Sequence, residues 1–107
     1  MTFRVFELTK AQWDKRRIFA WLFERSPQGA AAWLEAYDQM VARLSDVAGS
    51  LPVAPENSDL DLEVRQILFK TRHGRVYRAI CHIDGENVHI LRVRGPGQPP
   101  LSDDVLR

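Results

Sequence analysis

Two amphipathic segments meet at Ser26-Pro27 without any linker, and this junction constrains the fold more than any other feature of the sequence. Apolar residues recur at three- and four-residue spacing through residues 10–25 and again through residues 27–48, which is typical of helices with one buried face. Serine caps a helix N-terminus and proline is tolerated at the first helical position, so the dipeptide ends one helix and begins the next. Two helices joined this tightly must fold back as an antiparallel hairpin. The residues predicted to point away from the buried face of the first helix are Lys10, Asp14, Lys15 and Arg17.

Strands are predicted on both sides of this hairpin. Residues 2–8 alternate loosely between apolar and polar side chains, and two β-hairpins follow from about Leu62 to Arg94. The resulting order, β-α-α-β-β-β, predicts an α+β fold in which the helical hairpin packs on one face of a small, mostly antiparallel sheet. Thr9 is expected to cap the first helix, because Gln12 follows it at the spacing of a capping box.

The 107 residues contain no internal repeat, so a single domain over residues 1–107 is expected. Between the helices and the later strands, residues 49–61 hold two prolines and several turn-forming residues. A loop of this length is unusual in a compact domain and is therefore a candidate mobile or functional element. The tail at residues 95–107, GPGQPPLSDDVLR, cannot form a central strand and is expected to be flexible.

Arginines interrupt the strand pattern, and the register of the two β-hairpins decides which face of the sheet they occupy. The turn RHGR suggests a three-residue loop at residues 72–74, with Gly74 in the left-handed conformation. That loop places Lys70 opposite Val76 and on the same face as Arg78.

The second turn, DGENV, is interpreted in the same way, with Asn87 in the left-handed position and Asp84 opposite Val88. A two-residue loop is the alternative, but it turns the arginines of the last strand toward the core, where a charge without a partner costs several kcal/mol. The first register is therefore preferred, and it sets Arg78 opposite Arg94.

One face of the sheet is then apolar and the other is basic. The face predicted to pack against the helices carries Tyr77, Ala79, Cys81, Ile83, Leu91 and Val93, with His89 at its edge. The face predicted to be open carries Lys70, Arg78, Arg92 and Arg94, with Ile80, His82 and Ile90 between them. Like charges that lie opposite one another repel, so an anionic partner is expected, either phosphates or the carboxylates of a partner protein.

The composition argues against several other classes of protein. A net charge of +1 does not by itself indicate a nucleic-acid binder, and the single cysteine, Cys81, allows no internal disulfide, which fits a reducing cytoplasm. No apolar run approaches the roughly 18 residues of a membrane span, and the first ten residues do not resemble a signal peptide. The three histidines lack zinc-ligand spacing, so no metal or other cofactor is expected.

Four segments in a fixed order resemble the RelE/ParE superfamily, the toxins of type II toxin–antitoxin modules that are often labelled plasmid stabilisation proteins. The segments are SPQGAAAWLEAY (26–37), VRQIL (64–68), GRVYRAI (74–80) and VHILRVR (88–94), and together they span nearly the whole chain. The resemblance implies a bacterial, cytoplasmic protein that inhibits growth and is neutralised by a cognate antitoxin in a toxin–antitoxin hetero-oligomer.

The family divides by target. ParE-like members poison DNA gyrase, whereas RelE-like members are ribosome-dependent mRNA endonucleases. After Arg94 the sequence continues GPGQPPL, without the tyrosine or other base that the nuclease branch has near its C-terminus, so the resemblance favours gyrase or an undetermined target. The alternatives are a RelE-like endonuclease, which would make the protein an enzyme, and a non-toxic anion- or RNA-binding module or decayed toxin.

The resemblance also assigns roles to individual residues. Arg78 stands where the nuclease branch has an active-site arginine, and Lys70 or Arg65 stands for its upstream basic positions. His82 is the acid–base group in register on the same face. An endonuclease would therefore use Arg78, Lys70 and His82 in catalysis. The residues expected to bind the anionic partner are Arg65, Arg92 and Arg94.

Overall fold

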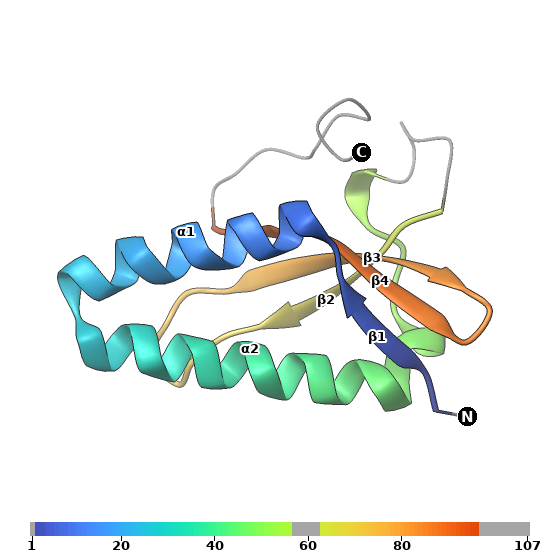
Figure 1. Cartoon of the computed structure of the whole chain (residues 1–107). Coiled ribbons are helices and arrows are strands. Elements are labelled where there is room, and N and C mark those ends of the chain that lie inside the picture. The colour runs from blue at the N-terminus through green and yellow to red at the C-terminus, as the bar shows by residue number, and fades with distance from the viewer. Residues whose placement is uncertain (1, 57–62, 97–107) are drawn as a thin grey trace.

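The computed structural model describes residues 2–56 and 63–96. Its elements are β1 (Arg4–Glu7), α1 (Thr9–Arg25), α2 (Pro27–Val47), the short 3-10 helix η1 (Ala48–Ser50), β2 (Arg65–Phe69), β3 (Tyr77–Asp84) and β4 (Asn87–Arg94). The strands form one sheet in the order β1-β4-β3-β2, parallel between β1 and β4 and antiparallel elsewhere. Figure 1 shows the helical hairpin lying across one face of this sheet, so the predicted α+β fold is confirmed. Most of the tail that was expected to be flexible, and the end of the expected long loop, lie outside the described residues.

The junction between the helices has the local structure that its residues dictate. Ser26 is extended, its Oγ accepts a hydrogen bond of 3.0 Å from the backbone N–H of Gly29, and Pro27 opens α2. The start of α1 differs from the prediction, because Leu8 is the N-cap residue and no side chain caps the helix. Leu8 is still extended where the chain leaves the sheet, so Thr9 is already the first helical residue.

The main core lies between the helical hairpin and the sheet. Its buried residues are Ala11, Trp33, Tyr37, Met40, Leu44, Ala48, Leu51, Ile67, Phe69, Ala79, Cys81, Val88, Ile90 and Val93. Trp33, Tyr37, Phe69 and Tyr77 form an aromatic cluster in which the contacting rings have centroids 5.6–5.9 Å apart. Aromatic pairs at this separation stabilise a fold beyond the area they bury, so the cluster fixes α2 against β2 and β3.

A polar contact joins β1 to both helices. The Tyr37 hydroxyl donates to Glu7 Oε2 at 2.8 Å, and Lys15 Nζ lies 3.4 Å from the same oxygen. Burial and the hydrogen bond to Glu7 raise the pKa of Tyr37, so its hydroxyl remains protonated and continues to donate. The Glu7 carboxylate at the end of β1 therefore accepts a hydrogen bond from Tyr37 of α2 and forms an ion pair with Lys15 of α1.

The turn between β3 and β4 is a two-residue loop, which corrects the predicted turn. Asp84 pairs with Asn87, so the expected pairing of Asp84 with Val88 is wrong. Gly85 adopts the left-handed conformation with a φ of 61°. Glycine has no Cβ to clash in the left-handed conformation, which explains why Gly85 adopts it and not Asn87, for which it was predicted.

A β-bulge keeps the arginines of β4 away from the helices despite this shorter turn. Ile80 pairs with Arg92, whereas Cys81 pairs with Ile90, so Leu91 is an extra residue on β4. One extra residue shifts the alternation of side chains by one position. The charge of Arg92 is therefore kept off the core face, as the preferred register required.

The bulge also exchanges the predicted positions of its neighbours. Ile90 is buried in the main core beneath the helices, whereas Leu91 packs against Ile80 in a separate cluster, which is the reverse of the prediction. His89 pairs with His82 on the face away from the helices and not at the edge of the helix-packed face.

The β2–β3 hairpin has the predicted register but a different turn conformation. Phe69 pairs with Tyr77, as the predicted register requires, and the ladder ends at that pair. Among the described residues only Gly85 has a positive φ, so the left-handed conformation predicted for Gly74 is wrong. A Cβ at Gly74 would collide with Thr71 Oγ1, so a larger residue here would require the Thr71 side chain to rotate.

The sheet face away from the helices is covered over β2 and β3, which corrects the prediction of an open face. Residues 51–56 run beside β2, and the Ala54 N–H donates to the Val64 carbonyl at 2.9 Å. Ala54, Val64 and Ile80 form a second buried cluster on this face. The chain therefore buries apolar side chains on both faces of its sheet, and the 51–56 segment supplies the second cover.

An acidic side chain of α1 occupies the edge of β4 where β1 ends. β1 pairs with β4 only as far as Ile90. Beyond that point Asp14 Oδ2 accepts the Val93 N–H at 2.9 Å, and the two oxygens of Asp14 accept from Arg92 at 2.7 and 2.8 Å. Asp14 is only 7% exposed, and a bidentate pair in such a setting costs a great deal to break.

We expect Asp14→Asn to lower the free energy of unfolding by about 3 kcal/mol, since it breaks the bidentate ion pair with Arg92, whose side chain is only 12% exposed. Urea unfolding followed by circular dichroism measures the loss. Asp38→Asn removes the same charge from the exposed surface of α2, and it should change stability by less than about 0.5 kcal/mol. Equal losses for the two variants would show that overall charge matters and the buried pair does not.

A second prediction concerns Cys81, which is fully buried in the main core. Burial raises the pKa of its thiol to about 12, and only the thiolate reacts quickly with disulfide reagents. At pH 8 we expect the folded protein to react with DTNB at least ~100-fold more slowly than the protein unfolded in guanidinium. The absorbance of the released thiol measures both rates, and similar rates would contradict the burial of Cys81.

Candidate functional site

Arg78 lies at the centre of the predicted basic face and pairs with Arg94 across the β3–β4 ladder, as predicted. Its terminal nitrogens donate to the two oxygens of Glu56 at 2.8 and 2.7 Å, and Gln66 Oε1 lies 3.4 Å away. Glu56 is fully buried, and the Arg78 side chain is 17% exposed. A bidentate carboxylate in this setting neutralises the guanidinium, so Arg78 does not present an unbalanced charge to a ligand.

Arg92 is also neutralised from within the chain. Its side chain is 12% exposed, and the hydrogen bonds that it donates to Asp14 raise the pKa of the guanidinium. Phosphates or a partner protein were expected to compensate these charges, but carboxylates of this chain, Glu56 and Asp14, neutralise Arg78 and Arg92.

Arg94 completes a row of three arginines on this face. Burial lowers the pKa of Arg94, and the positive charge of Arg92 lowers it further. A guanidinium remains protonated at physiological pH despite such a shift. The structure thus brings Arg78, Arg92 and Arg94 together and holds their charges close to one another.

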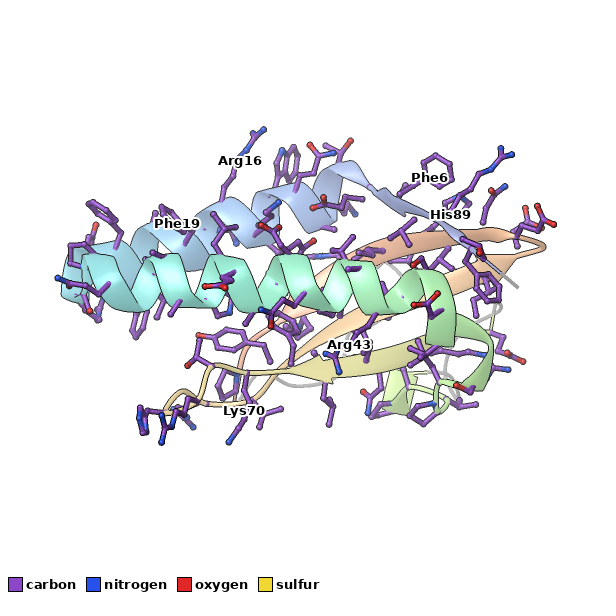
Figure 2. All side chains as sticks on the ribbon, turned by 90° about the horizontal axis from the view of Figure 1, so that it is seen from below. Phe6, Arg16, Phe19, Arg43, Lys70 and His89 are labelled. Atoms are coloured by element: carbon purple, nitrogen blue, oxygen red, sulfur yellow. The ribbon has the colours of Figure 1, made fainter. Side chains whose placement is uncertain are left out.

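Arg65 and Lys70 do not join this row. Arg65 donates to the Leu51 carbonyl at 2.6 Å and to Glu63 at 3.0 Å, so it anchors the segment that covers the sheet. Lys70 follows the end of β2 and, together with Arg43, lines a cavity beside α2. Figure 2 labels both side chains.

His82 is separated from the arginine row along β3. Its Nδ1 lies 2.9 Å from the Glu63 carbonyl oxygen, which can only accept, so Nδ1 carries the proton of this hydrogen bond. His82 stands four residues from Arg78, which at about 3.3 Å per residue is about 13 Å along the strand. Arg78, Lys70 and His82 are therefore not brought together around a site that could hold one phosphate.

Asp14 and Glu56 are the residues that sequence reasoning missed. The prediction that Asp14 points away from the core is wrong, and a signal for its burial was present in the sequence. Asp14 follows Ala11 by three residues and precedes Ile18 by four, which places it inside the apolar stripe of α1. Glu56 lies in a loop without periodicity, so no pattern could have paired it with Arg78.

The helical hairpin carries a groove on its outer side. This groove has a volume of about 300 Å³ and is lined by Glu7, Gln12, Lys15, Arg16, Phe19 and Leu34. Figure 2 shows Arg16 and Phe19 projecting from α1. Within residues 2–56 and 63–96, no helix is long and apolar enough to cross a membrane, and no three metal-ligating side chains gather in one place.

The fold is shared with a solved structure. A chain of the chromosomal ParDE TA (toxin–antitoxin) system from P. aeruginosa matches with a TM-score of 0.67, over 87% of this chain and 95% of that chain, at 20% sequence identity. No protein-family model and no curated protein matches the sequence significantly. The RelE/ParE-like fold predicted from the four sequence segments is confirmed by this likeness.

We expect Glu56→Gln to strengthen the binding of a polyanion, because it removes the counter-charge of Arg78 and keeps a side chain of the same size. The variant should elute from heparin–agarose at a higher salt concentration than the wild type. Glu35→Gln removes the same charge from the exposed surface of α2 and is the matched control. Equal shifts for both variants would mean that net charge alone sets the elution, which contradicts local neutralisation by Glu56.

Proposed function

We propose that this chain is the toxin of a type II toxin–antitoxin pair, which inhibits growth and is neutralised by a cognate antitoxin. The observation that carries the proposal is the fold, which matches a chain of a ParDE toxin–antitoxin system over 87% of this chain. The four sequence segments that resemble the RelE/ParE superfamily support the same function, and they lie on α2, β2, β3 and β4.

Within this proposal we favour DNA gyrase, or another target that is not cleaved, over mRNA. Cleavage by attack of a ribose 2′-OH needs a base, an acid and cations around one phosphate. Carboxylates of the chain hold Arg78 and Arg92, and His82 stands about 13 Å from Arg78 along β3. The ribosome-dependent endonuclease is the second candidate, because His82 is partly exposed and keeps one ring nitrogen outside its hydrogen bond.

The antitoxin is proposed to cover apolar side chains that β1 and α1 expose. Phe6, Leu8 and Trp13 are 41–54% exposed, and the centroids of the Phe6 and His89 rings are 5.7 Å apart. Figure 2 labels both of these rings. Large apolar side chains that are exposed in this way are candidates for a protein-binding surface. An antitoxin segment that folds on binding would bury these side chains.

The proposed place of action is the cytoplasm, where gyrase and ribosomes are.

Controlled expression in a bacterial host tests the function, with growth, mRNA integrity and plasmid supercoiling scored in the same cultures. We expect growth arrest with intact mRNA, and we expect the purified protein to inhibit supercoiling by purified gyrase. Normal growth in the presence of folded protein and without the antitoxin would contradict the toxin proposal. Growth arrest with cleaved mRNA would assign the chain to the endonuclease branch.

His82→Ala separates the two mechanisms without disturbing the core, because His82 is partly exposed. A gyrase poison should remain as toxic with this substitution as without it. An endonuclease that uses His82 as acid or base should lose about 10²–10⁴-fold in the rate of mRNA cleavage. His73→Ala, which changes an exposed histidine in the β2–β3 connection, is the control and should have no effect on either readout.

A further inference from the structure

A cleft opens where the tip of the helical hairpin meets the start of β3. It consists of two adjoining cavities of about 350 and 380 Å³, and Trp21, Arg75 and Tyr77 line both of them. Trp33 contributes to the first cavity and Arg17 to the second. These five residues define the tip cleft, which the proposed function does not use.

The aromatic walls of the tip cleft are fixed before any partner arrives. Trp33 is 2% exposed, and its ring stands edge-on to Tyr77 with the centroids 5.6 Å apart. The Arg25 guanidinium stacks 3.6 Å from the centroid of the Trp21 ring and donates to the Trp21 carbonyl at 2.8 Å. Trp21 nevertheless exposes 53% of its surface. A large side chain held in one orientation loses little entropy on binding, and tryptophan and arginine are enriched in binding hot spots.

The charge of the tip cleft is positive. Arg17, His73 and Arg75 line its cavities, and no carboxylate is found among the described residues of the lining. At the opposite end of β3 the turn to β4 exposes Asp84 and Glu86. The lining of the tip cleft is therefore basic, although the net charge of the chain is only +1.

We propose that the tip cleft is a docking site for an acidic segment of a partner protein that carries one or two large apolar side chains. Two cavities of about 350 and 380 Å³ with mainly apolar linings accept such side chains, and Arg17 and Arg75 are placed to meet the carboxylates. A nucleic-acid strand fits less well, because Arg25 already covers one face of Trp21. The described lining also offers no row of cations that could follow a phosphate backbone.

Selection from a random peptide library displayed on phage, against the purified folded chain, tests this docking site independently of any effect on growth. We expect the enriched sequences to be acidic and to contain aromatic or long aliphatic side chains. The most enriched peptide is then synthesised with a fluorophore, and its Kd is measured by fluorescence anisotropy. Trp21→Ala and Arg75→Glu should each weaken binding at least about tenfold, and the affinity should fall as salt is added.

Two variants outside the tip cleft serve as controls. Phe23→Ala removes an aromatic side chain of similar exposure from the same helix that lines neither cavity, and Arg4→Glu reverses a charge on β1, which lies far from the hairpin tip in Figure 1. Both should leave the Kd within about twofold, and circular dichroism checks that every variant is folded. The proposal is overturned if no peptide is enriched, if the enriched peptides are neutral or basic, or if they bind the Trp21→Ala variant as tightly as the wild type. It is also overturned if an oligo(dT) probe competes with the peptide and binds more tightly, since the cleft would then be a nucleic-acid site.

Discussion

A guanidinium that folding removes from water needs a negative charge beside it, and this requirement organises the whole sheet. Asp14 supplies this negative charge for Arg92. By accepting the Val93 N–H, Asp14 also fixes α1 along the part of β4 that β1 leaves unpaired. Glu56 supplies the negative charge for Arg78 and fixes the 51–56 segment over the other face. Each of the two layers that cover the sheet is thus held to it by one buried ion pair.

The parts of the fold that depend on neighbouring residues could be predicted from the sequence. The helical hairpin follows from the Ser26-Pro27 junction, and the register of β2 and β3 follows from the length of the turn between them. The β3–β4 turn could not be predicted in the same way, because the bulge at Leu91 compensates for a two-residue loop. Only the burial of side chains on both faces of the sheet decides between a longer turn and a shorter turn with a bulge.

The candidate site shows the same division between what is local and what is not. Alternation along a strand indicates which side chains share a face, and it correctly grouped Arg78, Arg92 and Arg94. Alternation contains no information about what lies over that face, so the covering segment and Glu56 were not foreseen. The tip cleft was missed for a related reason, because Trp21 and Arg75 come from elements that meet only in the folded chain. The likeness to a ParDE chain shows the fold alone and says nothing of these local arrangements.

The contacts that β4, the last strand, makes with β1 and α1 at the start of the chain have a consequence for synthesis on the ribosome. Asp14 and Arg92 are separated by 78 positions in the chain, so α1 leaves the ribosome long before the strand that neutralises its carboxylate and covers its apolar stripe. At a translation rate of about 5–20 residues per second, that interval lasts on the order of ten seconds. Non-local contacts of this kind also make folding slow. The nascent chain therefore cannot complete its sheet and core until β4 has emerged. A protein that recognises the completed fold can bind only several seconds after α1 has been synthesised.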